Sequence, residues 1–174
     1  MKILLGITGS VAAKLTPKIQ RAIIDNGHEV KTIFTQSSRH FLESNRLRIG
    51  EYEDENEWSY YKTNNQVLHI DLVKWSDKFV IAPCTANTLA KIYAGICDNL
   101  LTSCVKAWDY KKKMIIAPAM NTYMYKNPPT HKQITQMIDH GIVFVDPVEK
   151  ELFCGDTGVG AMAQIDDIIK KLED

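Results

Sequence analysis

Short apolar runs alternate along the chain with segments whose apolar residues recur at helical spacing. The first run, residues 3–7, is Ile-Leu-Leu-Gly-Ile and ends at a Thr-Gly-Ser turn, as buried parallel strands do. Thr16-Pro17 then suits a helix start and Asn26-Gly27 its end, with isoleucines on one face between them. A second strand is predicted at 29–34.

The same alternation continues to the end of the chain. It predicts strands at 78–82, 113–117 and 142–145, and helices near 86–93, 129–140 and 165–172. Strands separated by helical segments indicate an α/β fold: a doubly wound, flavodoxin- or Rossmann-like parallel sheet in a three-layer α/β/α sandwich. With 174 residues, the chain is expected to form a single domain, 1–174.

One segment departs from this alternation because it is strongly acidic. Residues 51–57 carry five acids in seven positions, and aromatic residues follow them. We predict a solvated surface loop here, with a binding lid as the alternative.

Composition narrows the possible partners. Lys and Arg total 21, as do Asp and Glu, so no net charge favours nucleic acid or an anionic membrane. The chain lacks a secretory leader and any apolar run of the roughly 18–20 residues that span a bilayer, so we expect a cytoplasmic protein. The cysteines are dispersed, which predicts reduced thiols and no metal site, with Cys84, Cys97 and Cys104 packed in the interior.

The junctions after the predicted strands are candidate sites, because ligands of doubly wound sheets bind beyond the carboxyl ends of the strands. The first junction contains Gly9, Ser10 and Val11, which suit either an anion site or a tight structural turn. It is not a Gly-x-Gly-x-x-Gly dinucleotide fingerprint.

Three further junctions carry hydrogen-bonding side chains. Thr35 and Ser37 follow the second strand, Thr85–Thr88 the third and Asn121 the fourth. Helix capping or turn formation is the competing interpretation at each of them. Junctions rich in Ser, Thr and Gly, without a P-loop lysine, suit a mononucleotide such as FMN.

Two other side chains are candidates for chemistry. His69 lies in an apolar segment, where it is either a core histidine or an acid/base group. Cys154 lies in a glycine-rich segment, where a thiol is better suited to reaction than to packing. We expect the other histidines to lie at the surface.

Several motifs, taken in order, point to one family. They are Gly-Ser-Val-Ala-Ala (9–13), Leu-His-Ile-Asp-Leu (68–72), Ala-Pro-Cys-Thr-Ala-Asn-Thr (82–88), Pro-Ala-Met-Asn (118–121) and Cys-Gly-Asp (154–156). From about Lys2 to its end, the chain resembles the flavin-containing cysteine decarboxylases, in particular the branch that acts in coenzyme A synthesis.

The resemblance implies FMN as cofactor and a set of residues that contact it: Gly9, Ser10, Val11, Thr35, Ser37, Thr85, Ala86, Asn87, Thr88 and Ala119. It further implies that His69 assists proton transfer, that Asn121 orients the substrate carboxylate, and that Cys154 supplies a proton in the reducing step. Asn121 and Phe153 are the implied substrate contacts. Assembly into homotrimers, or multiples of trimers, is implied as well.

The activity implied by the resemblance is decarboxylation of 4′-phosphopantothenoylcysteine to 4′-phosphopantetheine, through thiol oxidation, loss of CO₂ and re-reduction of the enethiol. Relatives that act on C-terminal cysteines of peptides lack the thiol, so Cys154 favours the coenzyme A branch. The alternatives are such a peptide decarboxylase or an inhibitory subunit of a protein phosphatase. A flavin prenyltransferase or a plain electron carrier fits less well, because neither uses the set of His69, Asn121 and Cys154.

Overall fold

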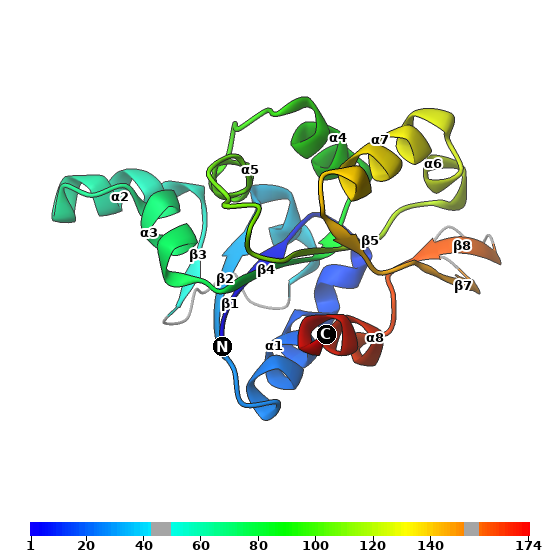
Figure 1. Cartoon of the computed structure of the whole chain (residues 1–174), viewed down its shortest axis with the longest axis horizontal. Coiled ribbons are helices and arrows are strands. Elements are labelled where there is room, and N and C mark those ends of the chain that lie inside the picture. Colours follow the sequence, from blue (N-terminus) through cyan, green and yellow to red (C-terminus); the bar gives the residue numbers. More distant parts are fainter. Residues whose placement is uncertain (43–49, 152–156) are drawn as a thin grey trace.

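A parallel sheet runs through the middle of the molecule in the computed structural model, which describes residues 1–42, 50–151 and 157–174 (Figure 1). Its strands pair in the order β3-β2-β1-β4-β5-β6, all in parallel. They are β1 (Lys2–Ile7), β2 (Glu29–Phe34), β3 (Glu51–Tyr52), β4 (Lys78–Cys84), β5 (Met114–Pro118) and β6 (Val143–Phe144). The predicted doubly wound α/β fold is confirmed.

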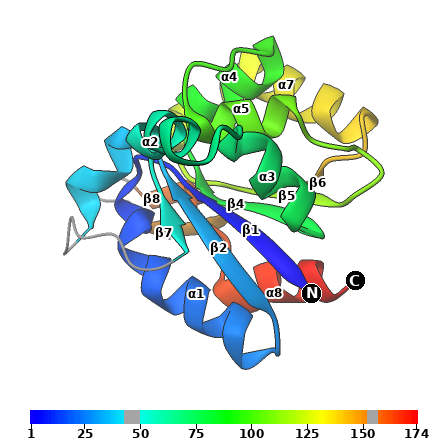
Figure 2. The same ribbon diagram turned by 90° about the vertical axis from the view of Figure 1, so that its left-hand side faces the viewer.

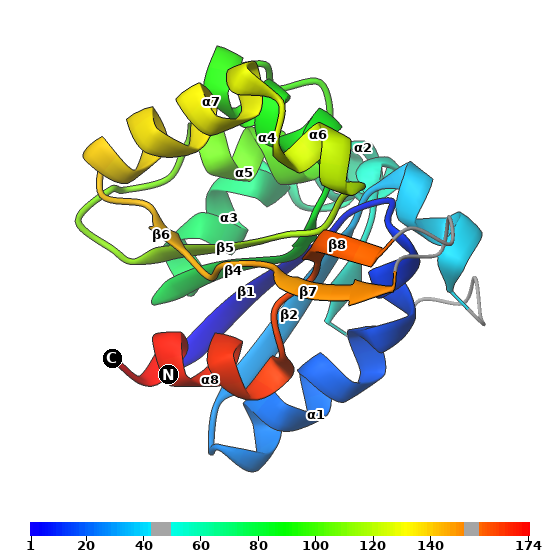
Figure 3. The same cartoon turned by 90° about the vertical axis from the view of Figure 1, so that its right-hand side faces the viewer.

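Helices cover both faces of the sheet (Figure 3). One face carries α1 (Thr16–Asp25) and α8 (Ile165–Glu173). The other carries α3 (Leu68–Trp75), α4 (Ala86–Ala94), α5 (Leu100–Lys106) and α7 (Pro128–Asp139). Ile3 and Leu5 of β1 pack against the first layer and Leu4 against the second. Burial on both faces explains why the strands are continuously apolar.

Several short elements lie outside this framework, and the hydrophobic pattern predicted none of them. Two 3₁₀ turns, η1 (Val11–Leu15) and η2 (Gln36–Phe41), follow β1 and β2. The helix α6 (Thr122–Tyr125) follows β5. An antiparallel hairpin of β7 (Val148–Glu151) and β8 (Thr157–Ala161) stands apart from the sheet at one end of the molecule (Figure 1).

The acidic stretch is not the predicted loop. Glu51 and Tyr52 form the edge strand β3, and Asp54 begins the helix α2 (Asp54–Asn64). Acidic side chains suit the first turn of a helix, where backbone N–H groups lack partners and the helix dipole is positive. No residue of α2 is buried, but of residues 51–57 only Glu55 is exposed, so the prediction of a solvated loop was wrong.

Two expectations about single residues were also wrong. The side chain of His28 is only 8% exposed, because its ring bonds Glu173 near the end of α8. Cys97 is exposed, whereas Cys84 and Cys104 are buried as predicted. Burial raises the pKa of the Cys84 thiol to about 12, so it stays protonated at neutral pH.

The described ranges contain no helix that is both long enough and apolar enough to cross a membrane. Within these same ranges, no cluster of three or more His, Cys, Asp and Glu residues could hold a metal ion.

Candidate functional site

The four predicted junctions lie at one edge of the sheet. Because β1, β2, β4 and β5 are parallel and adjacent, their carboxyl ends and the loops that follow them meet there. The buried Thr8 links two of these loops. Its hydroxyl donates to Pro83 O at 2.8 Å and accepts from Thr85 N at 2.9 Å.

The loops after β1 and β2 are packed tightly against each other. A Cβ atom on Gly9 would lie 2.5 Å from Ser37 Oγ, so this position has room only for glycine. Thr35 is buried, and its hydroxyl bonds Ile7 O and Ser37 Oγ, each at 3.2 Å. Ser10 is the N-cap of η1, where its Oγ accepts from Ala12 N at 3.3 Å.

The loop after β4 starts α4. Thr85 is the N-cap, and its Oγ1 accepts from Thr88 N at 3.2 Å. Ala86 and Asn87 form the first helical turn; Asn87 is exposed and Thr88 is buried. The capping interpretation is therefore correct for Thr85, and the first turn of α4 begins at the sheet edge, where helix-start N–H groups can bind an anion.

The loop after β5 is held by the hairpin. Met120 N donates to Gly160 O at 2.9 Å, and a Cβ on Gly160 would lie only 2.2 Å from Met120 O. Asn121 is the N-cap of α6, where its Oδ1 accepts from Tyr123 N at 2.8 Å. This cap fixes the side chain of Asn121 beside the strand end.

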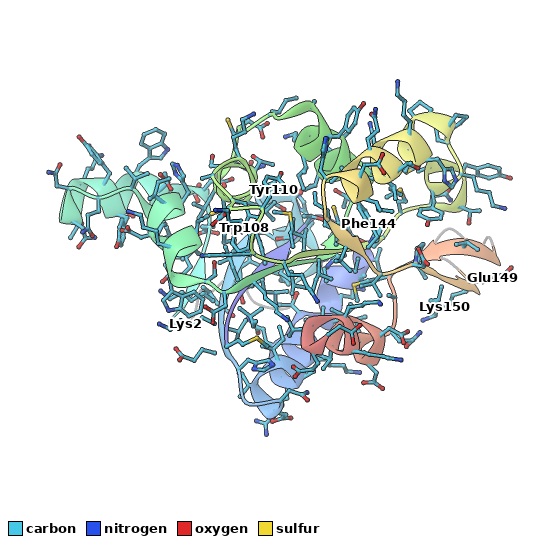
Figure 4. The ribbon with its side chains drawn as sticks, viewed as in Figure 1. Lys2, Trp108, Tyr110, Phe144, Glu149 and Lys150 are labelled. Atoms are coloured by element: carbon cyan, nitrogen blue, oxygen red, sulfur yellow. The ribbon has the colours of Figure 1, made fainter. Side chains whose placement is uncertain are left out.

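A cavity of about 730 Å³ opens at this edge, a volume in the range of small-molecule sites. Among the predicted site residues, it is lined by Ser10, Val11, Ala119 and Asn121. The hairpin and the start of α8 close its other side. Three lysines line it as well, Lys14, Lys18 and Lys150, and sequence reasoning did not find the first two. Figure 4 shows Lys150 on the hairpin.

His69 lies elsewhere in the chain, in the first turn of α3. Its Nδ1 is 2.8 Å from Oε1 of Glu57, a residue of α2, and its side chain is 26% exposed. It is therefore a half-buried, carboxylate-bonded histidine and not a core residue. Figure 1 shows α2 and α3 at the opposite end of the molecule from α6 and the hairpin, and Figure 2 shows the molecule from the α2 end. Within one chain, His69 does not line the cavity that contains Asn121.

The residues at the sheet edge fit a phosphorylated flavin. Hydroxyls and helix-start N–H groups are suitable donors for a phosphate monoester without a metal ion. Val11, Ala119 and Met162 give the cavity apolar walls suited to a flat ring system. Gly9 and Gly160 allow the surrounding loops to approach more closely than any side chain would permit.

Comparison with known proteins agrees with this fit. The profile of the family described as "Flavoprotein" matches residues 1–174. This chain belongs to the flavoprotein family. Among similar flavoproteins, phosphopantothenoylcysteine decarboxylase of Mus musculus is 42% identical over 174 residues, which cover 99% of this chain and 85% of the mouse protein.

Two solved structures are similar to the whole flavoprotein chain. A mutant PPC decarboxylase complexed with pantothenoylaminoethenethiol gives a TM-score of 0.93 at 43% identity and covers 99% of this chain and 96% of its own. The FMN binding protein AtHal3 gives a TM-score of 0.89 at 43% identity, with 99% and 94% covered. The predicted resemblance to flavin-containing cysteine decarboxylases is confirmed.

The predicted roles of Phe153 and Cys154 fall on positions outside the described residues. The other predicted site residues are described, and their assignments to FMN or substrate remain predictions. Glu57 is the residue of interest that sequence reasoning missed. Glu57 lies in an acidic run that is typical of solvated surface, and no sequence pattern indicates that a glutamate there bonds a histidine twelve positions later.

Proposed function

We propose that this flavoprotein is an FMN-dependent decarboxylase that converts 4′-phosphopantothenoylcysteine to 4′-phosphopantetheine. The observation that carries the proposal is the cavity in which Ser10, Val11 and Ala119 meet Asn121. It joins the residues suited to a flavin with an amide suited to a carboxylate. The similarity to phosphopantothenoylcysteine decarboxylase along nearly the full chain names the substrate. A single domain and a cytoplasmic location remain predictions.

The four junction loops would hold the cofactor. Gly9, Ser10 and Val11 after β1 would contact it together with Thr35 and Ser37 after β2. Thr85–Thr88 and Ala119 would contact it from the loops after β4 and β5. Bound FMN supplies a two-electron acceptor for the thiol end of the substrate and returns both electrons after CO₂ has left.

The protein side chains manage protons and orientation. An unactivated carboxylate does not leave as CO₂, whereas a carboxylate β to a C=S group does, because the electron pair of the broken bond moves to sulfur. His69 would take the thiol proton during oxidation, and the fixed amide of Asn121 would orient the carboxylate. Cys154 would donate the proton that completes the saturated product, which leaves no net redox change.

Lysines give the cavity a charge that suits the phosphate of the substrate. Lys14, Lys18 and Lys150 line it from η1, α1 and β7, and no acidic residue lines it in the described part of the chain. A dianionic phosphate is attracted to such a group of ammonium charges.

A second copy of the chain would complete the site. His69 does not line the cavity of its own chain, and its helix α3 lies at the opposite end of the molecule from the hairpin (Figure 1), while the proposed reaction uses both. In a homotrimer, each cavity would receive His69 from the neighbouring subunit. In a cyclic trimer the same two surfaces form every interface, so the contact between His69 and the neighbouring cavity would occur three times.

The test is a visible spectrum of the purified protein, followed by incubation with 4′-phosphopantothenoylcysteine and mass analysis. Flavin absorption bands and a saturated product that has lost CO₂ are expected. A protein that binds FMN but leaves the substrate unchanged would contradict the proposed substrate. A protein that is colourless and cannot be reconstituted with FMN would contradict the cofactor assignment.

A further inference from the structure

The helix α2 contains no buried residue and is held to the protein by carboxylates at its start and by Tyr60, which packs against the core and donates to Asp71 Oδ2 at 3.0 Å. Three acids at its start reach three different elements. Glu53 accepts from Arg39 of η2 at 2.9 Å, Asp54 from the backbone N of Leu100 at 2.8 Å, and Glu57 from His69. The helix is therefore anchored at points that do not involve Glu57.

Both carboxylate oxygens of Glu57 are used by one residue. Oε1 lies 2.8 Å from His69 Nδ1, and Oε2 accepts from the backbone N of His69 at 3.1 Å. That N–H lies in the first turn of α3 and has no intrahelical partner. The carboxylate of Glu57 thus fixes the position of the His69 backbone and the orientation of its ring together.

A third contact involves the backbone carbonyl of His69. Cys104 of α5 donates its thiol to His69 O at 3.7 Å. Burial, and then the charge of Glu57, raise the pKa of the Cys104 thiol, which stays protonated and remains a donor. In the described part of the chain, Nε2 of His69 has no hydrogen-bond partner.

We propose that Glu57 is a positioning residue that keeps the His69 proton on Nδ1 and so leaves Nε2 as the basic atom of the site. An ionised carboxylate can only accept hydrogen bonds, and a neutral imidazole carries its proton on one nitrogen. The proton must therefore lie on Nδ1, facing Glu57. The proposal rests on the proposed function for its chemistry, in which Nε2 receives the thiol proton of the substrate.

Glu57→Gln is the variant that tests this role. The backbone N–H of His69 is always a donor and requires the single oxygen of the introduced amide, which turns the amide NH₂ toward Nδ1. The ring must then accept at Nδ1 and carry its proton on Nε2. Glu55→Gln is the matched control, because Glu55 lies on the same helix, carries the same charge and is exposed.

Two measurements on the FMN-bound protein decide the proposal. Nitrogen-15 NMR of histidine-labelled protein at alkaline pH reports the His69 tautomer, with His69→Asn used to assign its signals. Single-turnover mixing with 4′-phosphopantothenoylcysteine reports the rate of flavin reduction. We expect the Nδ1–H form in the wild type and in Glu55→Gln. In Glu57→Gln we expect the Nε2–H form, and a reduction rate at least about tenfold lower at unchanged substrate affinity.

The outcomes separate this proposal from the proposed function. A wild-type ring that carries its proton on Nε2 would overturn the proposal, even if Glu57→Gln failed to fold. So would a Glu57→Gln protein that matches the wild type in tautomer and rate. If the substrate reduced no flavin in the wild type, the proposed function would fail, while the NMR result would still decide whether Glu57 sets the tautomer.

Discussion

His69 shows how one contact changes the interpretation of a residue. In the sequence it stands among apolar neighbours, where a core histidine and an acid/base group are both plausible. In the structure, it is half-buried and bonded to a carboxylate through one ring nitrogen. This arrangement is typical of histidines that transfer protons.

We predict that His69→Asn binds FMN but does not oxidise the substrate. Asparagine cannot accept the thiol proton, so flavin reduction should slow by about 10²- to 10⁴-fold. Bleaching of the flavin absorption on mixing with substrate measures this rate. His40→Asn removes an exposed histidine and serves as the control. Unchanged reduction in His69→Asn would remove this residue from the chemistry.

Cys154→Ser should separate loss of CO₂ from the final reduction. A serine hydroxyl is a far weaker acid than a thiol, so the enethiol should accumulate with the flavin still reduced. Mass analysis would show a product that has lost CO₂ and lacks two hydrogen atoms of the saturated compound. Normal saturated product from this variant would contradict a role for Cys154.

At the scale of elements, contacts between backbone segments shape the cavity. Gly160 in β8 has a φ of +153°, and a Cβ there would collide with Met120 O. Gly141, after α7, also has a positive φ of +88°, but a Cβ there would meet nothing within 4 Å. Comparison of the two positions separates backbone strain from steric conflict.

Gly160→Ala should therefore destabilise the protein more than Gly141→Ala. Strain alone costs roughly 1–3 kcal/mol, and only Gly160→Ala must also push the β5 loop away from the hairpin. Chemical denaturation measures the free energies of unfolding, and FMN titration measures the affinity for cofactor. If the two variants had equal free energies of unfolding and equal affinities for FMN, the hairpin would tolerate displacement of the β5 loop.

The anchoring of α2 predicts a pH effect. Burial raises the pKa of Asp54, even though Leu100 N donates to its carboxylate. As the pH rises above the ordinary value near 3.8, the unfolded chain releases this proton first, so Asp54 lowers the stability of the fold until the folded-state pKa is passed. Asp54→Asn keeps an oxygen acceptor without the charge.

Asp54→Asn should become more stable relative to the wild type between about pH 3 and pH 6. Urea denaturation across this range measures the difference, and Glu55→Gln controls for the loss of one exposed acid from the same helix. A difference between Asp54→Asn and wild type that does not change with pH would contradict a raised pKa at Asp54.

At the scale of the whole molecule, the separation of His69 from the cavity predicts that subunits share active sites. His69→Asn and Asn121→Ala should each be inactive alone. When they are mixed, unfolded and reassembled, about a quarter of the sites should combine an intact Asn121 with a neighbour's intact His69. Decarboxylation assays on the mixture measure this recovery. Persistent inactivity, with mixed assembly shown by mass, would place both residues in one chain's site.

The hydrophobic pattern predicted most strands of the sheet and several of its covering helices, but not the elements outside them. Five strands and four helices follow from buried runs and one-sided helices, since a layered core imposes those periods on the sequence, but α3 and α5, which also cover the sheet, were not predicted. The helix α2 buries no residue and so has no apolar period to detect. The hairpin is likewise outside the sheet, and its residues pack against a loop.

The sequence by itself determined the fold class, the family and the four junctions at one edge of the sheet, because the alternation of strands with helices and the local motifs are encoded in contiguous residues. Only the tertiary structure decided that Glu57 bonds His69, that lysines and the hairpin close the cavity around Asn121, and that His69 lies far from it. These are contacts between segments distant in the chain. Their geometry depends on how the layers pack, which no local pattern records.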